Sequence, residues 1–483
     1  MKALVTGGAG FVGTNLIKYL LSKHDDCTIF SLDNYTSGNK VNEILDDRVI
    51  YVDDDTWNIN SNSYLNDFSP DFVFHFGEFS RIVYSFTKTS LAFHSNTYGT
   101  QQVLEYCVKK GSKLVYSGSS ATFGNDSNDQ HLNPYSWTKS KNIELIKNYK
   151  EWFGLEYVIT YFYNVFGPGQ IGEGNYATLL GIFEKQYLNG TPLSVVLPGT
   201  QTRAFTHIDD IVEGVYLSTT QGDGDGYFLG CEKNIKIVDI ANMFKTDISF
   251  IPSVRGERES SKIIQSKAKT ELGWSPKNCI QHYIRDFIKN TPQQITIGVI
   301  GNGFVGKATQ ILKCDDVKCV VYDKDPALCI PENTTMTDLE KCHIIFICVP
   351  TPMKKDGSCS TRIVESVIHE LQETKYAGRI CVRSTVPVGF CQTYKVDFMP
   401  EFLTEKNWEK DFIECKQWLI GIDDNQGHNT QQLYTKLFTL SCNNKKLKYK
   451  NVSFHPTKYC ELVKYVRNVY LATKVSFCNE VYD

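Results

Sequence analysis

Short, continuously apolar runs alternate with longer stretches of helical spacing along most of the chain. The clearest of these runs are 2–6, 28–32, 71–76, 114–116, 295–300 and 319–322. Runs of this length and character are typical of strands buried on both faces of a parallel sheet. The pattern therefore predicts an α/β protein with two doubly wound parallel sheets, one after the other along the chain.

A glycine-rich turn follows the first predicted strand. Gly7, Gly10 and Gly13 have the spacing G-x-x-G-x-x-G, and a helical pattern runs on from them. Glycines at these positions permit a tight turn and let the backbone approach a pyrophosphate, which the helix N-terminus then attracts. Asp33 ends the second strand, where an acid would accept hydrogen bonds from an adenosine ribose. These features together predict a dinucleotide site.

The same arrangement returns after a polar, proline-containing segment, 291–294, which is a candidate linker. The strand 295–300 leads into the tighter G-x-G-x-x-G turn of 301–306, and Asp323 follows the next strand. The sequence therefore predicts a second dinucleotide site in a second domain.

Tyr135 and Lys139 form the most informative polar pair. They are four residues apart, so on a helix they share one face. A nearby ammonium favours the phenolate, and such a tyrosine can act as a general base. The strand 114–116 opens into the serine-rich loop 117–122, whose hydroxyls could bind a sugar and help to move its proton. The pair alone is a weak motif, but its combination with the glycine turn predicts an active site.

Composition narrows the classes of protein to which the chain could belong. The 483 residues carry a net charge of −3, which gives no excess for binding nucleic acid, and no apolar run approaches the ~18 residues of a membrane span. The chain opens with a strand pattern and not with a signal peptide. Sixteen cysteines without a C-x-x-C pair indicate reduced thiols in the cytoplasm. No metal is expected, because His75, His207 and His455 lack ligand spacing.

Seven motifs in order resemble the extended short-chain dehydrogenase/reductase family, and within it nucleotide-sugar 4-epimerases such as UDP-glucose 4-epimerase. The resemblance covers residues 1 to about 290. The motifs are Thr6–Gly13, Leu32-Asp33-Asn34, Asn96-x-x-Gly99-Thr100, Ser119–Thr122, Tyr135-x-x-x-Lys139, Tyr163–Pro168 and Arg203–Ile211.

The resemblance implies a Rossmann-type domain with a small substrate-binding subdomain within about 165–290, and it implies roles for individual residues. Tyr135 would be the base, Lys139 would make the phenol more acidic, and Ser120 would assist at the sugar O4, although Ser119 or Thr122 could replace it in a loop that is one residue short. NAD would be bound by Gly7, Gly10, Phe11, Val12, Asp33, Asn34, Asn96, Tyr135 and Lys139. The nucleotide diphosphate would be bound by Asn164, Arg203 and Arg255.

Two further features distinguish this chain within the family. Related dehydratases and decarboxylases place carboxylates in the serine loop, whereas this chain has Ser120-Ala121-Thr122, which favours oxidation and re-reduction at C4. The segment Glu78-Phe79-Ser80-Arg81 departs from the usual small residues. Arg81 could bind a substrate carboxylate or phosphate, or it could pair with Glu78. The identity of the sugar stays open.

Residues 295–483 resemble UDP-glucose 6-dehydrogenase and its relatives. By this resemblance NAD would be bound by Gly301, Gly303, Phe304, Val305, Asp323, Thr351 and Thr385, and the sugar by Glu401, Lys464 and Asn468. The domain 295–455 would be followed by a long helix, 456–483, that packs against its twin in a homodimer. The family's further domain, with its nucleophilic cysteine, is not in the sequence, so we expect no independent turnover from this half.

The expected function is therefore an NAD-dependent UDP-sugar 4-epimerase in residues 1–290, with one NAD in each half. Two alternatives remain open. A 4-ketoreductase or another oxidoreductase could use the same Tyr135, and net consumption of NADH would reveal it. A non-catalytic nucleotide-sugar-binding or assembly protein is the other alternative.

Overall fold

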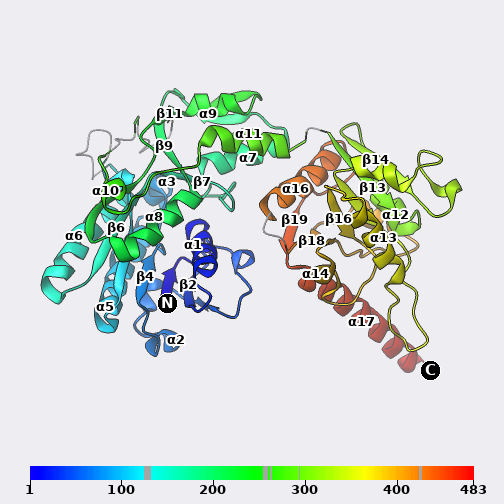
Figure 1. The fold of residues 1–483 in the computed structure, drawn as a ribbon, viewed down its shortest axis with the longest axis horizontal. Coiled ribbons are helices and arrows are strands. Elements are labelled where there is room, and N and C mark those ends of the chain that lie inside the picture. The colour runs from blue at the N-terminus through cyan, green and yellow to red at the C-terminus, as the bar shows by residue number, and fades with distance from the viewer. Residues whose placement is uncertain (124–131, 254–258, 261–263, 293, 424–426, 483) are drawn as a thin grey trace. The chain divides into compact units, whose positions relative to one another are not determined.

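The computed structural model describes residues 1–483 except 124–131, 254–258, 261–263, 293, 424–426 and 483. The chain divides into two compact units, Met1–Asp286 and Phe287–Asp483 (Figure 1). The division falls within α11 (Ile280–Asn290), a few residues before the segment predicted as a linker.

The first unit is built around a seven-stranded sheet in which every neighbouring pair is parallel. Its strands are, in spatial order, β10 (Gly224–Leu229), β6 (Tyr157–Phe162), β5 (Lys113–Ser119), β4 (Phe72–His75), β1 (Lys2–Thr6), β2 (Thr28–Asp33) and β3 (Val49–Asp53). The order reverses between β1 and β4, and in doubly wound sheets a ligand binds outside the carboxyl ends of the strands at this point.

Helices cover both faces of this sheet, as a doubly wound fold requires (Figure 1). On one face α1 (Phe11–Lys23) and α8 (Ile208–Gln221) pack through buried residues such as Leu16, Ile17 and Ile211. On the other face lie α5 (Thr100–Lys110) and α6 (Pro134–Phe153), which contribute Leu104 and Ile146 to a second core. The predicted alternation of strands and helices is confirmed.

Two short sheets form a smaller layer in the first unit. One has the order β11 (Asn234–Lys236), β9 (Thr202–His207), β7 (Asn164–Phe166), and the other pairs β12 (Ile248–Ile251) with β8 (Leu193–Val196). Helices α7 (Leu179–Asn189) and α9 (Ile237–Met243) accompany them.

The second unit has its own seven-stranded sheet. The strand order is β14 (Val317–Tyr322), β13 (Ile295–Ile300), β15 (Ile344–Ile347), β16 (Arg379–Val382), β17 (Asp397–Phe398), β18 (Trp418–Gly421) and β19 (Val452–His455). The pair β17–β18 is antiparallel, so this sheet is mixed where an all-parallel sheet was predicted. Its helices include α12 (Phe304–Gln310), α13 (Arg362–Glu373), α14 (Phe390–Tyr394), α16 (Gly427–Asn443) and α17 (Thr457–Tyr482).

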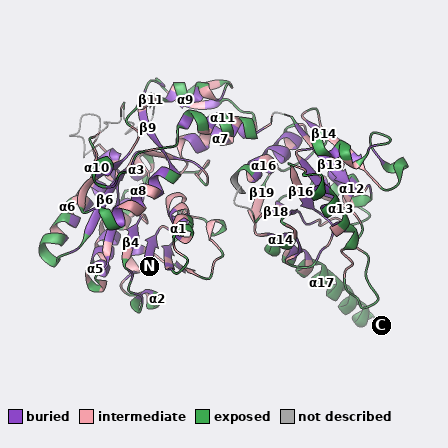
Figure 2. Cartoon of the chain, in the orientation of Figure 1, coloured by how far each residue is buried: buried purple, intermediate pink, exposed green. Residues whose placement is uncertain are grey.

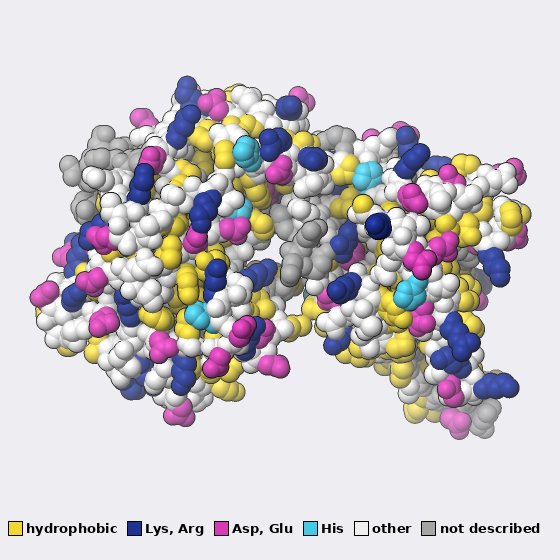
Figure 3. All heavy atoms as spheres, in the orientation of Figure 1, with side chains coloured by type: hydrophobic (Ala, Val, Ile, Leu, Met, Phe, Trp, Pro, Cys, Tyr) yellow, Lys and Arg dark blue, Asp and Glu magenta, His cyan; other side chains and the backbone are white. Residues whose placement is uncertain are grey.

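The surface of each unit mixes charges of both signs, and Figure 3 shows no large region of one sign on the visible face. From residue 466 onward the described part of α17 is exposed (Figure 2). All sixteen cysteines are free thiols, and Cys279 and Cys478 are the exposed ones. No described helix is both long enough and apolar enough to span a membrane.

Candidate active site

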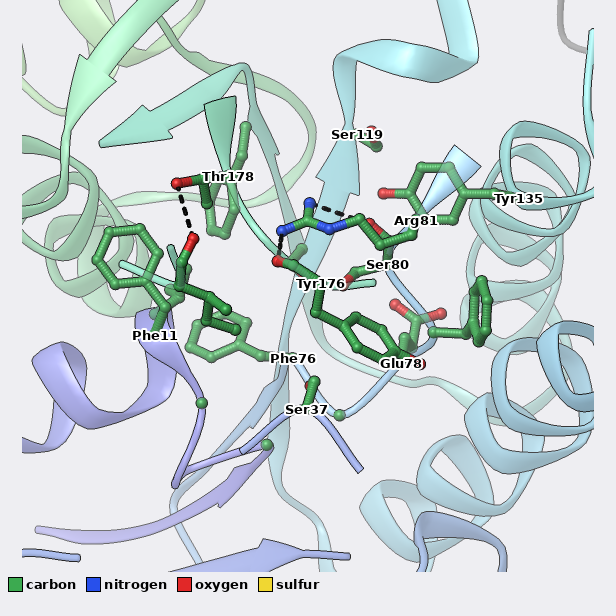
Figure 4. Close-up of a pocket in the computed structure, with 18 of the residues that line it drawn as sticks. Phe11, Ser37, Phe76, Glu78, Ser80, Arg81, Ser119, Tyr135, Tyr176 and Thr178 are labelled. Atoms are coloured by element: carbon green, nitrogen blue, oxygen red, sulfur yellow. Dashed lines mark hydrogen bonds between the residues drawn. The ribbon is translucent and has the colours of Figure 1, made fainter. Parts of the chain in front are cut away.

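A cavity of about 650 Å³ in the first unit lies over the carboxyl ends of β1, β2, β4 and β5 (Figure 4). Its lining includes most of the residues expected to bind cofactor or substrate in this unit. These are Gly7, Gly10, Phe11, Val12, Asp33, Asn34, Arg81, Ser119, Ser120, Tyr135, Lys139 and Asn164.

The glycine turn has a geometry that only glycine permits. Gly7 has a φ of +73°, and a Cβ atom on Gly13 would lie 2.2 Å from the Gly7 carbonyl oxygen. The Asp33 carboxylate accepts hydrogen bonds from the backbone amides of Ala9, at 2.9 Å, and Tyr35, at 2.8 Å. Burial raises the pKa of Asp33, and the two amide bonds oppose that rise. The turn therefore has the close helix–strand contact and the acid that a bound dinucleotide needs.

Helix α6 brings Tyr135 to the opposite side of the cavity. Asn133 caps the helix, with its Oδ1 accepting a hydrogen bond from the Ser136 amide at 2.8 Å, and Pro134 occupies the first turn. The Tyr135 amide also donates to Ser85 Oγ at 3.3 Å. Figure 4 shows the Tyr135 hydroxyl directed toward the Arg81 side chain.

Lys139 is neutralised by a partner that the sequence analysis did not assign to it. Its ammonium forms a buried ion pair with Glu78 and donates to the Ser117 carbonyl at 2.6 Å. The Glu78 carboxylate also accepts hydrogen bonds from Tyr116 Oη at 3.0 Å and Asn142 Nδ2 at 2.8 Å. The acid at position 78, where the resembled family has a small residue, was the available signal. The two partners are 61 positions apart in the sequence, so no local pattern indicated their contact.

Arg81 does not pair with Glu78, so that alternative is wrong. Its guanidinium donates to the Tyr176 carbonyl and, at 3.5 Å, to the Ser80 carbonyl, while its Nε is buried without a hydrogen-bond partner. Burial lowers the pKa of Arg81, and the neighbouring phenol groups of Tyr135 and Tyr176 oppose this shift. Arg81 is therefore a cation that projects into the cavity without an ion-pair partner among the described residues (Figure 4).

The serine loop offers three hydroxyls in different positions. Ser119 Oγ accepts a hydrogen bond from the Ala121 amide at 3.2 Å, and Thr122 Oγ1 donates to the Ser119 carbonyl at 2.7 Å. Ser119 and Ser120 line the cavity, whereas the described lining does not include Thr122. This geometry favours a serine over Thr122 as the residue assisting Tyr135.

Three residues expected at the site lie elsewhere or cannot be placed. Asn96 is fully buried and bonds both the amide and the carbonyl of Phe79, so it holds the loop that carries Glu78 and is absent from the described cavity lining. Arg203 lies on β9, where it donates to the Thr202 carbonyl at 2.9 Å, and it too is absent from that lining. Arg255 lies outside the described residues.

The second unit repeats the glycine turn closely. Gly301 has a φ of +95°, and a Cβ atom on Gly306 would lie 1.9 Å from the Gly301 carbonyl oxygen. The Asn302 amide donates to the Asp323 carboxylate at 2.6 Å, as the Ala9 amide does to Asp33 in the first unit. Gly303 caps α12, which opens with Phe304 and Val305.

The remaining residues predicted in the second unit fall into three places. Thr351 and Thr385 follow β15 and β16, and the Cys359 thiol contacts both of their carbonyl oxygens, at 4.0 and 3.3 Å. Lys464 pairs with the Glu401 carboxylate, and burial lowers the pKa of Lys464. Asn468 is exposed on α17, so the structure brings Glu401 and Lys464 together without it.

Comparison with known proteins agrees with this description. Residues 3–230 match the model of the NAD dependent epimerase/dehydratase family, and residues 330–438 match the NAD binding domain of the UDP-glucose/GDP-mannose dehydrogenase family. The second match begins after the glycine turn of that unit.

Individual relatives resemble the first unit at low identity. A UDP-glucuronic acid decarboxylase from Arabidopsis thaliana is 27% identical over 57% of this chain and 84% of the relative. A putative UDP-glucose 4-epimerase from Methanocaldococcus jannaschii is 27% identical over 57% of this chain and 93% of the relative. The crystal structure of UDP-glucuronic acid 4-epimerase from Bacillus cereus, complexed with UDP-glucuronic acid and NAD, has 27% identity and a TM-score of 0.55 over 60% of this chain and 99% of that one.

Both units are thus NAD-binding Rossmann domains, and NAD is their cofactor. The first unit carries the epimerase domain of the short-chain dehydrogenase/reductase class, and the second carries a UDP-glucose/GDP-mannose dehydrogenase NAD-binding domain. The epimerase/dehydratase domain of the first unit accordingly supports an NAD-dependent nucleotide-sugar enzyme.

Proposed function

We propose that the first unit is a UDP-sugar 4-epimerase. The observation that supports this most directly is the shared cavity, in which Tyr135 faces the space above the glycine turn. The serine loop from Ser119 to Phe123 supplies hydroxyls and no carboxylate, so it lacks the acid that an elimination at the sugar would need.

In this proposal Tyr135 takes the proton from the sugar O4 and later returns it. Gly7, Gly10 and Asp33 would hold NAD, which when bound can accept the C4 hydride and later return it. Ser119 or Ser120 positions the O4 hydroxyl, and Lys139 lies beneath Tyr135 on the same helical face. Between the oxidation and the re-reduction the sugar rotates within the cavity and presents its other face. The cofactor therefore returns to its original oxidation state. Positioning of this kind can lower a barrier by roughly 7–11 kcal/mol.

The test is incubation of the full chain with a panel of UDP-sugars, with the C4 configuration followed by NMR. Tyr135→Phe should lower the rate by at least about 100-fold, because proton transfer by a positioned side chain contributes about 10²–10⁴-fold. Tyr64→Phe, at a tyrosine that is 70% exposed, is the matched control and should retain full activity.

Two results would contradict the proposal. Unchanged turnover in Tyr135→Phe would remove the assigned base. Formation of one NADH and one 4-keto product per sugar, without a change to the other C4 epimer, would identify a net oxidoreductase such as a 4-ketoreductase running in reverse.

For the second unit, which binds NAD, we propose a homodimer contact through residues 456–483, whose described part is exposed from residue 466 onward.

A further inference from the structure

Arg81 carries a charge for which the described residues of the first unit provide no counter-ion. It precedes α3 (Ile82–Thr87), and its side chain extends into the cavity between Tyr135 and Tyr176 (Figure 4). Two carbonyl oxygens accept from its terminal nitrogens, and its Nε has no partner. Carbonyl groups satisfy hydrogen bonds but leave the positive charge uncompensated.

The acids in the described lining of the cavity are bonded to other groups, and Asp54 among them accepts hydrogen bonds from the side chains of Asn58 and Asn62. Glu78 is bound to Lys139, and Asp33 accepts hydrogen bonds from the backbone amides of Ala9 in the glycine turn and of Tyr35. Arg81 is half-buried and its Nε is fully buried. A partly dehydrated cation without a counter-ion is costly, so a cavity that retains one is suited to an anionic ligand. The planar guanidinium of arginine can also donate two parallel hydrogen bonds to the two oxygens of one carboxylate.

The place of Arg81 beside Tyr135 determines which anion it can meet. Tyr135 acts at O4 of the hexose in the proposed reaction. In a pyranose ring, C1 with its diphosphate lies across the ring from C4, whereas C5 and its substituent C6 are next to C4. Of the two positions that can carry an anion, C6 therefore lies nearer than the diphosphate to a cation beside the C4 base.

We propose that the substrate is a UDP-uronic acid, a UDP-hexose with a carboxylate at C6, and that Arg81 binds this carboxylate. The inference rests on the proposed 4-epimerase function and adds its substrate class. Arg81 is then the residue that selects acidic over neutral sugars, and Ser80, Ser119 and Thr178 are polar neighbours for the sugar hydroxyls.

The experiment compares UDP-glucuronic acid, UDP-glucose and UDP-N-acetylglucosamine with the full-length chain loaded with NAD. The kcat/KM of each is measured for wild type, Arg81→Gln and Arg81→Lys. The wild type should favour the uronic acid by about 10- to 100-fold, the size expected for a hydrogen bond to a charged group. Arg81→Gln should lose this preference through a higher KM, and Arg81→Lys should keep part of it. Arg285→Gln, at an exposed arginine, is the matched control and should behave as wild type.

Binding provides a readout that does not depend on turnover. Isothermal titration of the Tyr135→Phe chain should give a Kd for UDP-glucuronic acid at least about tenfold below that for UDP-glucose, and adding Arg81→Gln should equalise the two. Circular dichroism and bound NAD check that each variant is folded.

The outcomes separate the two proposals. If no UDP-sugar is epimerised but the titration shows the Arg81-dependent preference, the 4-epimerase proposal fails and the substrate class stands. The proposed substrate class would be overturned if neutral sugars were epimerised as fast as the uronic acid. It would also be overturned if Arg81→Gln lowered kcat/KM equally for all sugars, which would mean that Arg81 acts on Tyr135.

Discussion

At the scale of single residues, the charges of the site are arranged differently from the arrangement that the sequence suggests. The Tyr135–Lys139 spacing correctly places both side chains on one face of α6 and in one cavity. The lysine charge, however, is balanced by the buried carboxylate of Glu78, and the unbalanced cation beside Tyr135 is Arg81. Pairings between residues distant in the chain depend on the folded geometry, so no local pattern could give them.

We expect the Glu78–Lys139 pair to be strongly coupled. Glu78→Gln leaves a buried ammonium without its counter-ion and should lower the free energy of unfolding by about 3–5 kcal/mol. Lys139→Met should also destabilise, because it leaves the carboxylate alone. The double variant should cost clearly less than the sum of the two, as measured by urea unfolding in a double-mutant cycle. Additive losses would mean that the two charges do not interact. The exposed pair Lys141–Glu144 on the same helix is the control, and its coupling should be below about 1 kcal/mol.

At the scale of elements, the glycine turns and their helices were predictable, because their conformations depend on nearby residues. Gly7 and Gly301 have the positive φ that the motif requires, and each turn is fixed by the acid at the end of the following strand. The packing of α7 was not predictable from local pattern. Its Glu184 is buried against the polar groups of Tyr283 on α11, and such a burial depends on elements about one hundred residues apart.

Glu184 makes the stability of the first unit depend on pH. Burial raises its pKa from 4.5 to about 7, although Tyr283 and Gln170 offset part of the rise. Between these two values the folded chain holds a proton that the unfolded chain has released, so the free energy of unfolding falls as the pH rises. The full effect corresponds to about 3 kcal/mol.

Glu184→Gln should therefore stabilise the protein relative to wild type at pH 8 and give no such gain at pH 4.5. Urea unfolding at the two pH values measures this difference. Glu151→Gln, at an exposed glutamate, should show equal effects at both. A Glu184→Gln gain that is the same at both pH values would exclude a raised pKa as its cause.

At the scale of the whole molecule, the sequence correctly indicated two successive NAD-binding Rossmann domains, since each begins with its own strand, glycine turn and acid. It did not indicate the antiparallel strand pair of the second sheet, because strand direction is set by connections and not by composition. It also suggested Asn96 and Arg203 as ligand contacts, and both stay predictions: Asn96 bonds the Phe79 backbone and Thr138, and neither residue is in the described cavity lining.

Self-association is the prediction that belongs to this scale. Val469, Tyr470 and Phe477 on α17 are each more than 60% exposed, as one expects of a helix that packs against a second copy. Sedimentation should show a dimer, and Val469→Lys combined with Phe477→Lys should weaken it at least about tenfold. Tyr64→Lys, at an equally exposed side chain of the first unit, should leave the dimer intact. A wild-type chain that remains monomeric at tens of micromolar would rule out this contact.

The distribution of free thiols has a practical consequence. Cys279 belongs to the first unit and Cys478 to the second, and they are the exposed members of the sixteen. Maleimide dyes under mild conditions should therefore attach preferentially at one position in each unit, without engineered cysteines. Energy transfer between such a donor and acceptor would report whether loading a nucleotide sugar in one domain changes its distance from the other.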